Sequence, residues 1–285
     1  MKHIFITGAT SGLGKAAALQ LAGEGAVVIA TSRNPDKGAK LLADYSEQFP
    51  KGKGRIELVE CNLASFESIN MACDEVLESY DHLDAIINNA GIMVHDFTET
   101  RDGIELTWQI NLLAPMLISH LLIPKFKKAL EPKLIFTSSG FHIGRIYLED
   151  PEFKKRHYIS WQAYRQSKLG LILLTRLLAL RLTEEGIGVY VQHPGMVNTD
   201  IARTSGRLLN LMLRFMGSSP EKGALTLLYL ANTSNEDLIS GEYYARSRVM
   251  KSSPFSYDLN EAEKLMEKVE SYLKKYITEK SLIFP

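Results

Sequence analysis

The first fifteen residues carry the feature that most restricts the fold, a buried strand that runs directly into a glycine-rich turn. Residues 4–6 form a short apolar run, and the turn after it has the spacing T-G-x-x-x-G-x-G, with glycines at Gly8, Gly12 and Gly14. Residues 16–22 are small or apolar and favour a helix. Glycines let the backbone approach a phosphate closely, and free N–H groups at a helix N-terminus attract an anion. A plain tight turn would also use glycines, but this order of elements predicts the pyrophosphate site of a dinucleotide-binding fold.

Strand-like and helix-like segments alternate along the next part of the chain. Helices are predicted at 35–49, 65–80, 101–129 and 161–185, and buried strands lie between them at 26–31, 56–61, 83–88, 133–138 and 188–193. Near-continuous apolar strands separated by helices indicate a parallel sheet that is covered on both faces. The pattern predicts an α/β fold, with residues 1–285 forming one Rossmann-type domain around a doubly wound, mostly parallel sheet of about seven strands.

The last third of the chain is less regular. Residues 196–218 are predicted to form a substrate-loop helix, because the run 208–216 is too apolar for a solvated loop. Such a helix must bury its apolar face against the core, a partner subunit or a ligand, and all three remain open. A short final strand is predicted at 241–244, and residues 258–278 are predicted to form an amphipathic C-terminal helix.

Composition excludes several classes of function. Lys and Arg total 33 and so do Asp and Glu, so no net field draws the protein to nucleic acid or to an anionic membrane. Cys61 and Cys73 are the only cysteines and lack metal-type spacing, which predicts no metal site and a reduced, cytoplasmic setting. No window approaches the roughly 20 apolar residues of a membrane span, and the first strand leaves no room for a secretory segment.

Polar or glycine-containing segments follow three later strands at their carboxyl ends, where doubly wound sheets bind ligands. These segments are 88–91, 138–139 and 193–195. Tyr164 and Lys168, four residues apart, share one face of the helix that follows the second segment. A nearby ammonium favours the phenolate, so it would lower the Tyr pKa from about 10 towards the value that a general acid or base requires. Taken alone, the pair is also compatible with a solvated helix face.

These motifs, taken in order, resemble those of the short-chain dehydrogenase/reductase family over nearly the full length of the chain. The matching residues are Thr7-Gly8-x-x-x-Gly12-x-Gly14, Asn88-Asn89-Ala90-Gly91, Asn111, Ser139, Tyr164-x-x-x-Lys168 and Pro194-Gly195.

The resemblance also implies the catalytic roles. Tyr164 is implied to donate or accept the proton, and Ser139, rather than the adjacent Ser138, to hydrogen-bond the substrate oxygen. Lys168 is implied to lower the Tyr164 pKa and to hold the nicotinamide ribose. Asn111, within the helix predicted at 101–129, is implied to anchor a proton-relay water.

The resemblance further implies an NADP(H) site. The end of the strand at 26–31 has no acid to hold a ribose 2′-hydroxyl, whereas Ser32 and Arg33 can bind a 2′-phosphate. Arg33 is otherwise simply a surface charge. Asn62 stands where many family members have an Asp that contacts the adenine. The predicted cofactor residues are Gly8, Thr10, Ser11, Gly12, Leu13, Gly14, Ser32, Arg33, Asn62, Leu63, Asn89, Ala90, Gly91, Tyr164, Lys168, Pro194, Gly195, Val197 and Thr199.

The segment between Ser139 and Tyr164, residues 140–163, is longer than is usual in the family. In this it resembles the retinol-dehydrogenase-like branch, which often handles lipophilic carbonyl compounds. With the apolar run 208–216, it predicts a bulky, apolar substrate. Many members of that branch begin with a membrane anchor, which is not expected here.

The resulting prediction is hydride transfer between NADP(H) and the carbonyl or alcohol carbon of a lipophilic small molecule. Two alternatives remain open, an NADPH-dependent reductase of an activated C=C bond and a non-catalytic nucleotide-binding redox sensor. The complete Asn–Ser–Tyr–Lys set favours an enzyme. The resemblance also implies a homodimer or homotetramer that pairs through the helices at 101–129 and 161–185.

Overall fold

The computed structural model describes residues 1–195, 219–277 and 283. Its strands form one eight-stranded sheet in the order β3-β2-β1-β4-β5-β6-β7-β8. The strands are β1 (His3–Ile6), β2 (Val27–Ser32), β3 (Arg55–Glu60), β4 (Ala85–Asn88), β5 (Lys133–Thr137), β6 (Gly188–His193), β7 (Tyr243–Ala245) and β8 (Arg248–Val249). The strand order and the parallel pairing confirm the doubly wound Rossmann-type fold.

The eighth strand is the one that the sequence does not predict. β1 to β7 pair in parallel, whereas β8 pairs antiparallel to β7. The two strands are joined by Arg246 and Ser247, whose φ values are 54° and 56°. Two positive φ values define the type I′ hairpin turn that best matches strand twist, and its usual signal is Asn-Gly. The turn was missed because Arg-Ser carries no such signal.

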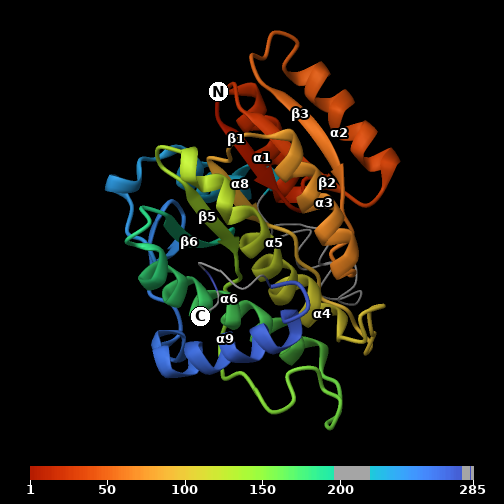
Figure 1. Cartoon of the computed structure of the whole chain (residues 1–285), viewed down its shortest axis with the longest axis vertical. Coiled ribbons are helices and arrows are strands. Elements are labelled where there is room, and N and C mark those ends of the chain that lie inside the picture. The colour runs from red at the N-terminus through yellow and green to blue at the C-terminus, as the bar shows by residue number, and fades with distance from the viewer. Residues whose placement is uncertain (196–218, 278–282, 284–285) are drawn as a thin grey trace.

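Helices cover both faces of the sheet (Figure 1). One face packs against α1 (Gly12–Gly23), α2 (Pro35–Gln48) and α8 (Pro220–Asn232). The other packs against α3 (Phe66–Ser79), α5 (Ala114–Leu122) and α6 (Ser160–Leu182), and α9 (Leu259–Leu273) lies outside α6.

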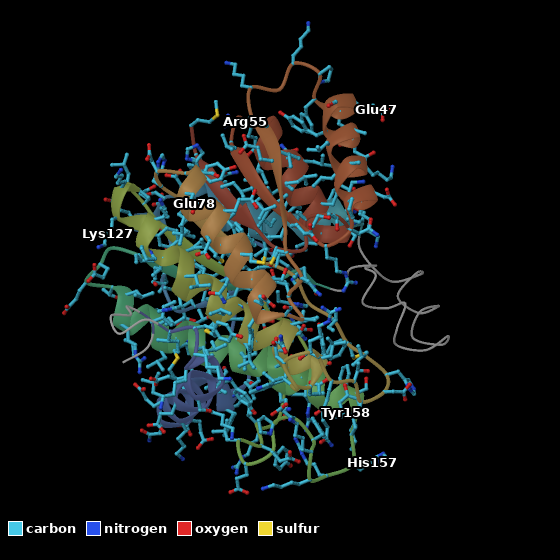
Figure 2. The ribbon with its side chains drawn as sticks, turned by 45° about the vertical axis from the view of Figure 1, so that its right-hand side comes forward. Glu47, Arg55, Glu78, Lys127, His157 and Tyr158 are labelled. Carbon is cyan, nitrogen blue, oxygen red and sulfur yellow. The ribbon has the colours of Figure 1, made fainter. Side chains whose placement is uncertain are left out.

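Successive side chains of a strand pack alternately into the two hydrophobic cores, one on each face of the sheet. In β1, the Phe5 side chain belongs to the core beneath α3, α5 and α6, whereas Ile4 and Ile6 belong to the core beneath α1 and α8. Successive side chains of a strand point to opposite faces, so a continuous apolar run fills two cores at once. Glu47, Arg55, Glu78 and Lys127 are exposed and point away from the fold (Figure 2).

The single helix predicted at 101–129 is wrong. The chain turns at Gly103, which has a φ of 73°, and α4 (Leu106–Trp108) begins only after Glu105. The Glu105 carboxylate caps α4 by accepting the N–H groups of Thr107 and Trp108 at 2.8 and 2.7 Å. A π-helical turn (Gln109–Leu113), α5 and a 3₁₀ helix (Ile123–Lys128) follow.

The stretch Leu106–Lys128 is long and apolar enough to cross a membrane by length and composition alone. However, 89% of its most apolar 18-residue segment is buried inside the fold. Its apolar side chains belong to the core beneath α3, α5 and α6. The same core also takes the apolar face of α9, which begins at Leu259 and ends at Leu273 rather than at residue 278. The substrate-loop helix predicted at 196–218 lies outside the described residues.

Candidate active site

The glycine turn after β1 is a packed loop in which a Cβ atom has no room. Gly8 and Gly12 have φ values of 70° and 51°, which glycine adopts without strain. A Cβ on Gly14 would overlap the carbonyl oxygen of Gly8 and Nδ2 of Asn89. Glycine is therefore required here by the close approach of the turn to the segment after β4.

Thr7 joins this turn to the segment after β4. Its buried hydroxyl oxygen accepts the backbone N–H groups of Asn89 and Ala90 at 3.0 and 3.1 Å. In return, Nδ2 of Asn89 donates to the Thr7 carbonyl at 3.0 Å and to the Gly8 carbonyl at 3.4 Å. The structure therefore gives Asn89 the task of holding the loop together.

The N-terminus of α1 is open to an anion. The side chain of its N-cap residue, Ser11, makes no capping hydrogen bond, and its first turn holds no acid. By contrast, α2 and α3 begin with Asn34 and Ser65, whose side chains accept N–H groups of their own helices. Uncapped donors and the helix dipole fit a pyrophosphate. The predicted cofactor residues at this helix start are Thr10, Ser11, Gly12, Leu13 and Gly14.

The ends of β2 and β3 carry the residues predicted to meet the adenosine part of the cofactor. The Ser32 hydroxyl donates to the Asn34 carbonyl at 2.8 Å. Arg33 is exposed, and no acid in the described ranges pairs with its guanidinium. Asn62 is also exposed, whereas Leu63 packs partly against the core. Arg33 is therefore available to a phosphate in solution.

Tyr164 and Ser139 meet where α6 passes the end of β5. Tyr164 is buried in the second turn of α6, with the Ser139 side chain near enough to its phenol to influence its pKa. Burial raises the pKa of Tyr164, and the Ser139 side chain lowers it. A proton donor and an oxygen-binding hydroxyl need such proximity.

Lys168 lies one turn further along α6. Its Nζ is 5.8 Å from the centroid of the Tyr164 ring and donates to the Thr137 carbonyl at 2.9 Å. Burial lowers the pKa of Lys168 to about 7. The causes of the shift in the Tyr164 pKa are burial and the Ser139 side chain, and Lys168 is not among them. The effect of Lys168 on that pKa stays a prediction.

Ser138 has a different task from Ser139. Its hydroxyl donates to the Lys168 carbonyl at 2.7 Å, and its N–H donates to the Gln192 carbonyl at 2.8 Å. Ser138 therefore ties the end of β5 to the backbone of α6 and to β6. The sequence does not predict this structural role of Ser138, because only Ser139 of the two adjacent serines is implied to bind the substrate oxygen.

Asn111 lies in the π-helical turn between α4 and α5. Its Oδ1 accepts the N–H of Ile92, and its Nδ2 donates to the Ile92 carbonyl, both at 2.8 Å. Nδ2 also donates to Ser167 Oγ at 3.0 Å, and Ser167 donates to the Tyr164 carbonyl at 2.7 Å. Asn111 thus connects the segment after β4 to the catalytic helix. Its predicted relay role stays a prediction.

Gly91 and the His193-Pro194-Gly195 segment border the same site. A Cβ on Gly91 would come within 2.9 Å of Lys168 Nζ and 3.4 Å of Asn111 Oδ1. Gly195, two residues after the end of β6, has a φ of 82°. The predicted cofactor residues Val197 and Thr199 lie outside the described residues.

The arrangement has the parts of a proton-transfer site. It combines a buried phenol, a hydroxyl beside it and a buried amine close by, beside an anion-ready helix start. Within residues 1–195, 219–277 and 283, no group of three His, Cys, Asp or Glu side chains could hold a metal ion. The residues present fit a dinucleotide, because the packed glycine turn and the uncapped helix lie at the end of β1.

A comparison with family models matches residues 2–208 to the short chain dehydrogenase family. The chain belongs to the short-chain dehydrogenase/reductase family. Retinol dehydrogenase 11 of Mus musculus is 35% identical over 247 residues, which cover 86% of this chain and 77% of that protein. Retinol dehydrogenase 14 of Mus musculus is 32% identical over 281 residues, covering 93% and 84%. The resemblance to the retinol-dehydrogenase-like branch is thereby confirmed.

Solved structures agree on the fold of this chain. An uncharacterized protein from Mycobacterium Paratuberculosis has a TM-score of 0.77 and 29% identity, covering 96% of this chain and 94% of its own. An NADPH-bound carbonyl reductase from chicken fatty liver has a TM-score of 0.65 and 25% identity, covering 88% and 99%.

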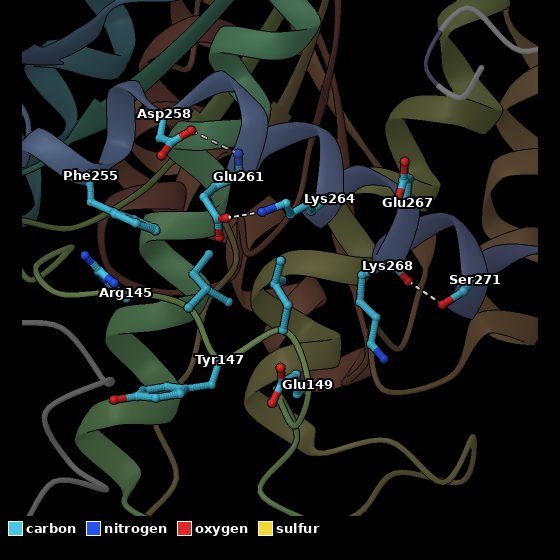
Figure 3. A pocket seen from close by; sticks show the side chains of 12 residues that line it. Arg145, Tyr147, Glu149, Phe255, Asp258, Glu261, Lys264, Glu267, Lys268 and Ser271 are labelled. Atoms are coloured by element: carbon cyan, nitrogen blue, oxygen red, sulfur yellow. Dashed lines mark hydrogen bonds and ion pairs between the residues drawn. The ribbon is translucent and has the colours of Figure 1, made fainter.

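Hydrogen bonds hold the long segment after β5 to Glu105 on one side and to α9 on the other. The Glu152 carboxylate accepts the backbone N–H of Glu105 at 3.0 Å and the Tyr272 hydroxyl at 2.8 Å. A surface cavity of about 830 Å³ separates residues 145–149 from α9 (Figure 3). Charges of both signs line it, and Lys264 pairs with Glu261 there at 2.7 Å. It contains none of the predicted catalytic residues, so it is separate from the candidate active site.

Proposed function

We propose that this protein is an NADP(H)-dependent oxidoreductase that transfers a hydride between nicotinamide and the carbonyl or alcohol carbon of a lipophilic substrate. The observation that carries this proposal is the buried pair on α6, where Lys168 Nζ lies 5.8 Å from the centroid of the Tyr164 ring, with Ser139 beside the phenol. The names of the relatives, retinol dehydrogenases and a carbonyl reductase, support the same reaction class.

The chain's own residues would handle the proton and the substrate oxygen, while the bound nicotinamide supplies or accepts the hydride. In reduction, Tyr164 donates its proton to the oxygen of the substrate, and the Ser139 hydroxyl donates a hydrogen bond to the same atom. The phenolate that remains is an anion, and the Lys168 ammonium stabilises it. Because burial lowers the Lys168 pKa to about 7, an adjacent anion would favour its charged form.

The preference for NADP(H) rests on the end of β2. Arg33 is exposed and Ser32 is next to it, and a guanidinium binds a phosphate through charge-assisted hydrogen bonds. The chicken carbonyl reductase, whose structure contains NADPH, supports this choice.

The lipophilic substrate is supported by the segment that follows Ser139. Phe141 and Ile143, two and four residues after Ser139, expose 44% and 52% of their surfaces. Apolar side chains that remain exposed close to a catalytic residue suit an apolar ligand better than a sugar. The retinol dehydrogenases named above support the same class.

A substrate panel tests the proposal. Purified protein is incubated with NADPH or NADH and with a retinoid aldehyde, a steroid ketone, an enone and a short sugar aldehyde. We expect the highest kcat/KM with NADPH and a lipophilic carbonyl compound. Reduction of only the enone's C=C bond would favour the alternative reductase, and tight NADPH binding without turnover of any substrate would favour the sensor.

We also propose a reducing, cytoplasmic setting and a homodimer or homotetramer. Cys61 and Cys73 are free, buried thiols, which suits a reducing compartment. Light scattering on the purified protein measures the oligomeric state.

A further inference from the structure

A buried histidine behind the catalytic serine has no part in the proposed proton transfer. His142 is 6% exposed, and both of its ring nitrogens have partners. Nδ1 lies 2.6 Å from the carbonyl oxygen of Ser139, and Nε2 accepts the backbone N–H of Ser253 at 2.9 Å. The ring therefore bridges the catalytic serine and a residue 111 positions further along the chain.

These two partners define the tautomer of His142. A backbone N–H can only donate, so Nε2 must be unprotonated, and a carbonyl oxygen can only accept, so Nδ1 must carry the proton. Burial lowers the pKa of His142, and the nearby Arg176 charge adds to this effect, whereas the Ser139 contact opposes it. Tyr243 and His193, on the neighbouring strands, complete its surroundings. The ring is neutral at pH 7.

The peptide of Ser139 is held by further contacts on the same side. The Tyr243 hydroxyl donates to the Ser139 carbonyl at 3.4 Å, and the Tyr243 ring lies 4.9 Å from the His142 ring. The backbone N–H of Phe141 donates to Ser139 Oγ at 3.2 Å. The orientation of the Ser139 hydroxyl is thus coupled to the position of its own carbonyl.

Ser253 is itself firmly placed. Its hydroxyl donates to the His142 carbonyl at 2.9 Å. The neighbouring Ser252 accepts from the Arg176 guanidinium of α6 at 3.0 Å, and that guanidinium lies 3.9 Å over the Tyr257 ring. The donor that selects the tautomer of His142 is therefore fixed to the catalytic helix.

We propose that His142 is a positioning residue, whose Nδ1–H tautomer, selected by the Ser253 N–H, fixes the Ser139 peptide so that its hydroxyl meets Tyr164. This inference rests on the proposed function. Without the Nδ1 donor, Ser139 loses its alignment with Tyr164. The Ser139 side chain lowers the Tyr164 pKa, so this loss raises the pKa and moves the pH at which alcohol oxidation becomes fast upwards.

Five variants separate the two hydrogen bonds. His142→Phe removes both, His142→Asn keeps a donor near the Nδ1 position, and His142→Gln keeps an acceptor near the Nε2 position. Ser253→Pro removes the N–H and the hydroxyl and puts a ring carbon in place of the amide hydrogen that points at Nε2, at a φ of −61° that proline adopts, and Ser253→Ala deletes only the hydroxyl. His120→Phe, at another buried histidine whose pKa burial lowers, controls for the general effect of replacing a buried imidazole by a phenyl ring.

We expect His142→Phe and His142→Gln to lower kcat for alcohol oxidation about tenfold and to shift the pH–kcat profile upwards, at unchanged NADP⁺ affinity. His142→Asn should restore most of kcat, and Ser253→Pro should lower it more than Ser253→Ala. The ¹⁵N spectrum of His142 in the wild-type protein should show the Nδ1–H tautomer without any cofactor.

An Nε2–H tautomer would overturn the inference. So would equal kcat and pH profiles in the wild type and in His142→Phe, or equal losses in His142→Asn and His142→Gln. If His142→Phe does not fold, the Asn–Gln pair and the serine pair decide. If the wild type oxidises no alcohol and reduces no carbonyl, the proposed function fails, and the ¹⁵N spectrum still decides the tautomer.

Discussion

The glycine turn (residues 7–14) and the catalytic helix α6 lie at the same edge of one sheet, but different means hold them in place. In the turn, Gly14 is fixed by the absence of a side chain, since a Cβ would overlap Gly8 and Asn89. On α6, Lys168 is fixed by the presence of partners, the Thr137 carbonyl for its amine and the Ser138 hydroxyl for its backbone.

This contrast predicts which kind of substitution damages the glycine turn and which kind damages α6. Besides the hydrogen bonds of Thr7 with Asn89 and Ala90, the turn depends on steric fit at Gly14 against Gly8 and Asn89, so adding one carbon there is enough to damage it. The catalytic helix depends on hydrogen bonds from other segments, such as the Asn111–Ser167 contact, so the loss of one polar atom is enough there. The four predictions below test this contrast, from the largest expected effect to the smallest.

Tyr164→Phe should remove catalysis and leave the cofactor cradle intact. The change deletes the proton donor but keeps the buried ring, and general acid–base help is worth about 10²–10⁴ in rate. Turnover of a carbonyl substrate and the Kd for NADPH are measured together. Wild-type kcat in this variant would remove Tyr164 from the reaction.

Gly14→Ala should disturb the glycine turn and weaken NADPH binding. The new methyl group has to displace Gly8 or Asn89, a kind of overpacking that costs about 1–3 kcal/mol. Calorimetry gives the Kd and the Tm gives the loss of stability. Gly103→Ala is the control, because nothing lies within 4 Å of its Cβ and its φ of 73° strains any other residue by about 1–2 kcal/mol. A similar fall in Tm with unchanged NADPH affinity is expected there.

Thr7→Val tests the contact between the turn and the segment after β4. The shape is conserved, but the N–H groups of Asn89 and Ala90 lose their acceptor, at a cost of about 1–3 kcal/mol for an unsatisfied group. Urea denaturation measures the free energy of unfolding. Thr7→Ser keeps the oxygen and should stay close to the wild type. Equal losses in the two variants would show that the methyl group, and not the hydroxyl, matters.

Arg33→Ala should have the smallest effect, confined to one cofactor. Loss of a charge-assisted contact to a 2′-phosphate should raise the KM for NADPH about tenfold and leave the KM for NADH unchanged. Lys37→Ala removes an exposed cation nearby on α2 and controls for the general field. If both variants raise the two KM values equally, Arg33 does not select the cofactor.

Local features of the sequence predict the parallel sheet, the glycine turn and the position of Tyr164 and Lys168 on one helix. These follow from local rules: apolar runs fill two cores, glycines remain where a Cβ would overlap the backbone, and a spacing of four places Tyr164 and Lys168 on one helix face.

Only the tertiary structure decided which polar groups meet. The bond from Ser138 to the carbonyl of Lys168, the clamp of Asn111 on Ile92 and the bridge from His142 to Ser253 join segments distant in sequence. No local periodicity records such pairings, because a hydroxyl or an imidazole can bond to any suitably placed partner. The start of α4 after Gly103 and Glu105 could not be predicted for a related reason. The apolar spacing favoured a longer helix, whereas the buried Glu105 carboxylate caps the helix at this point.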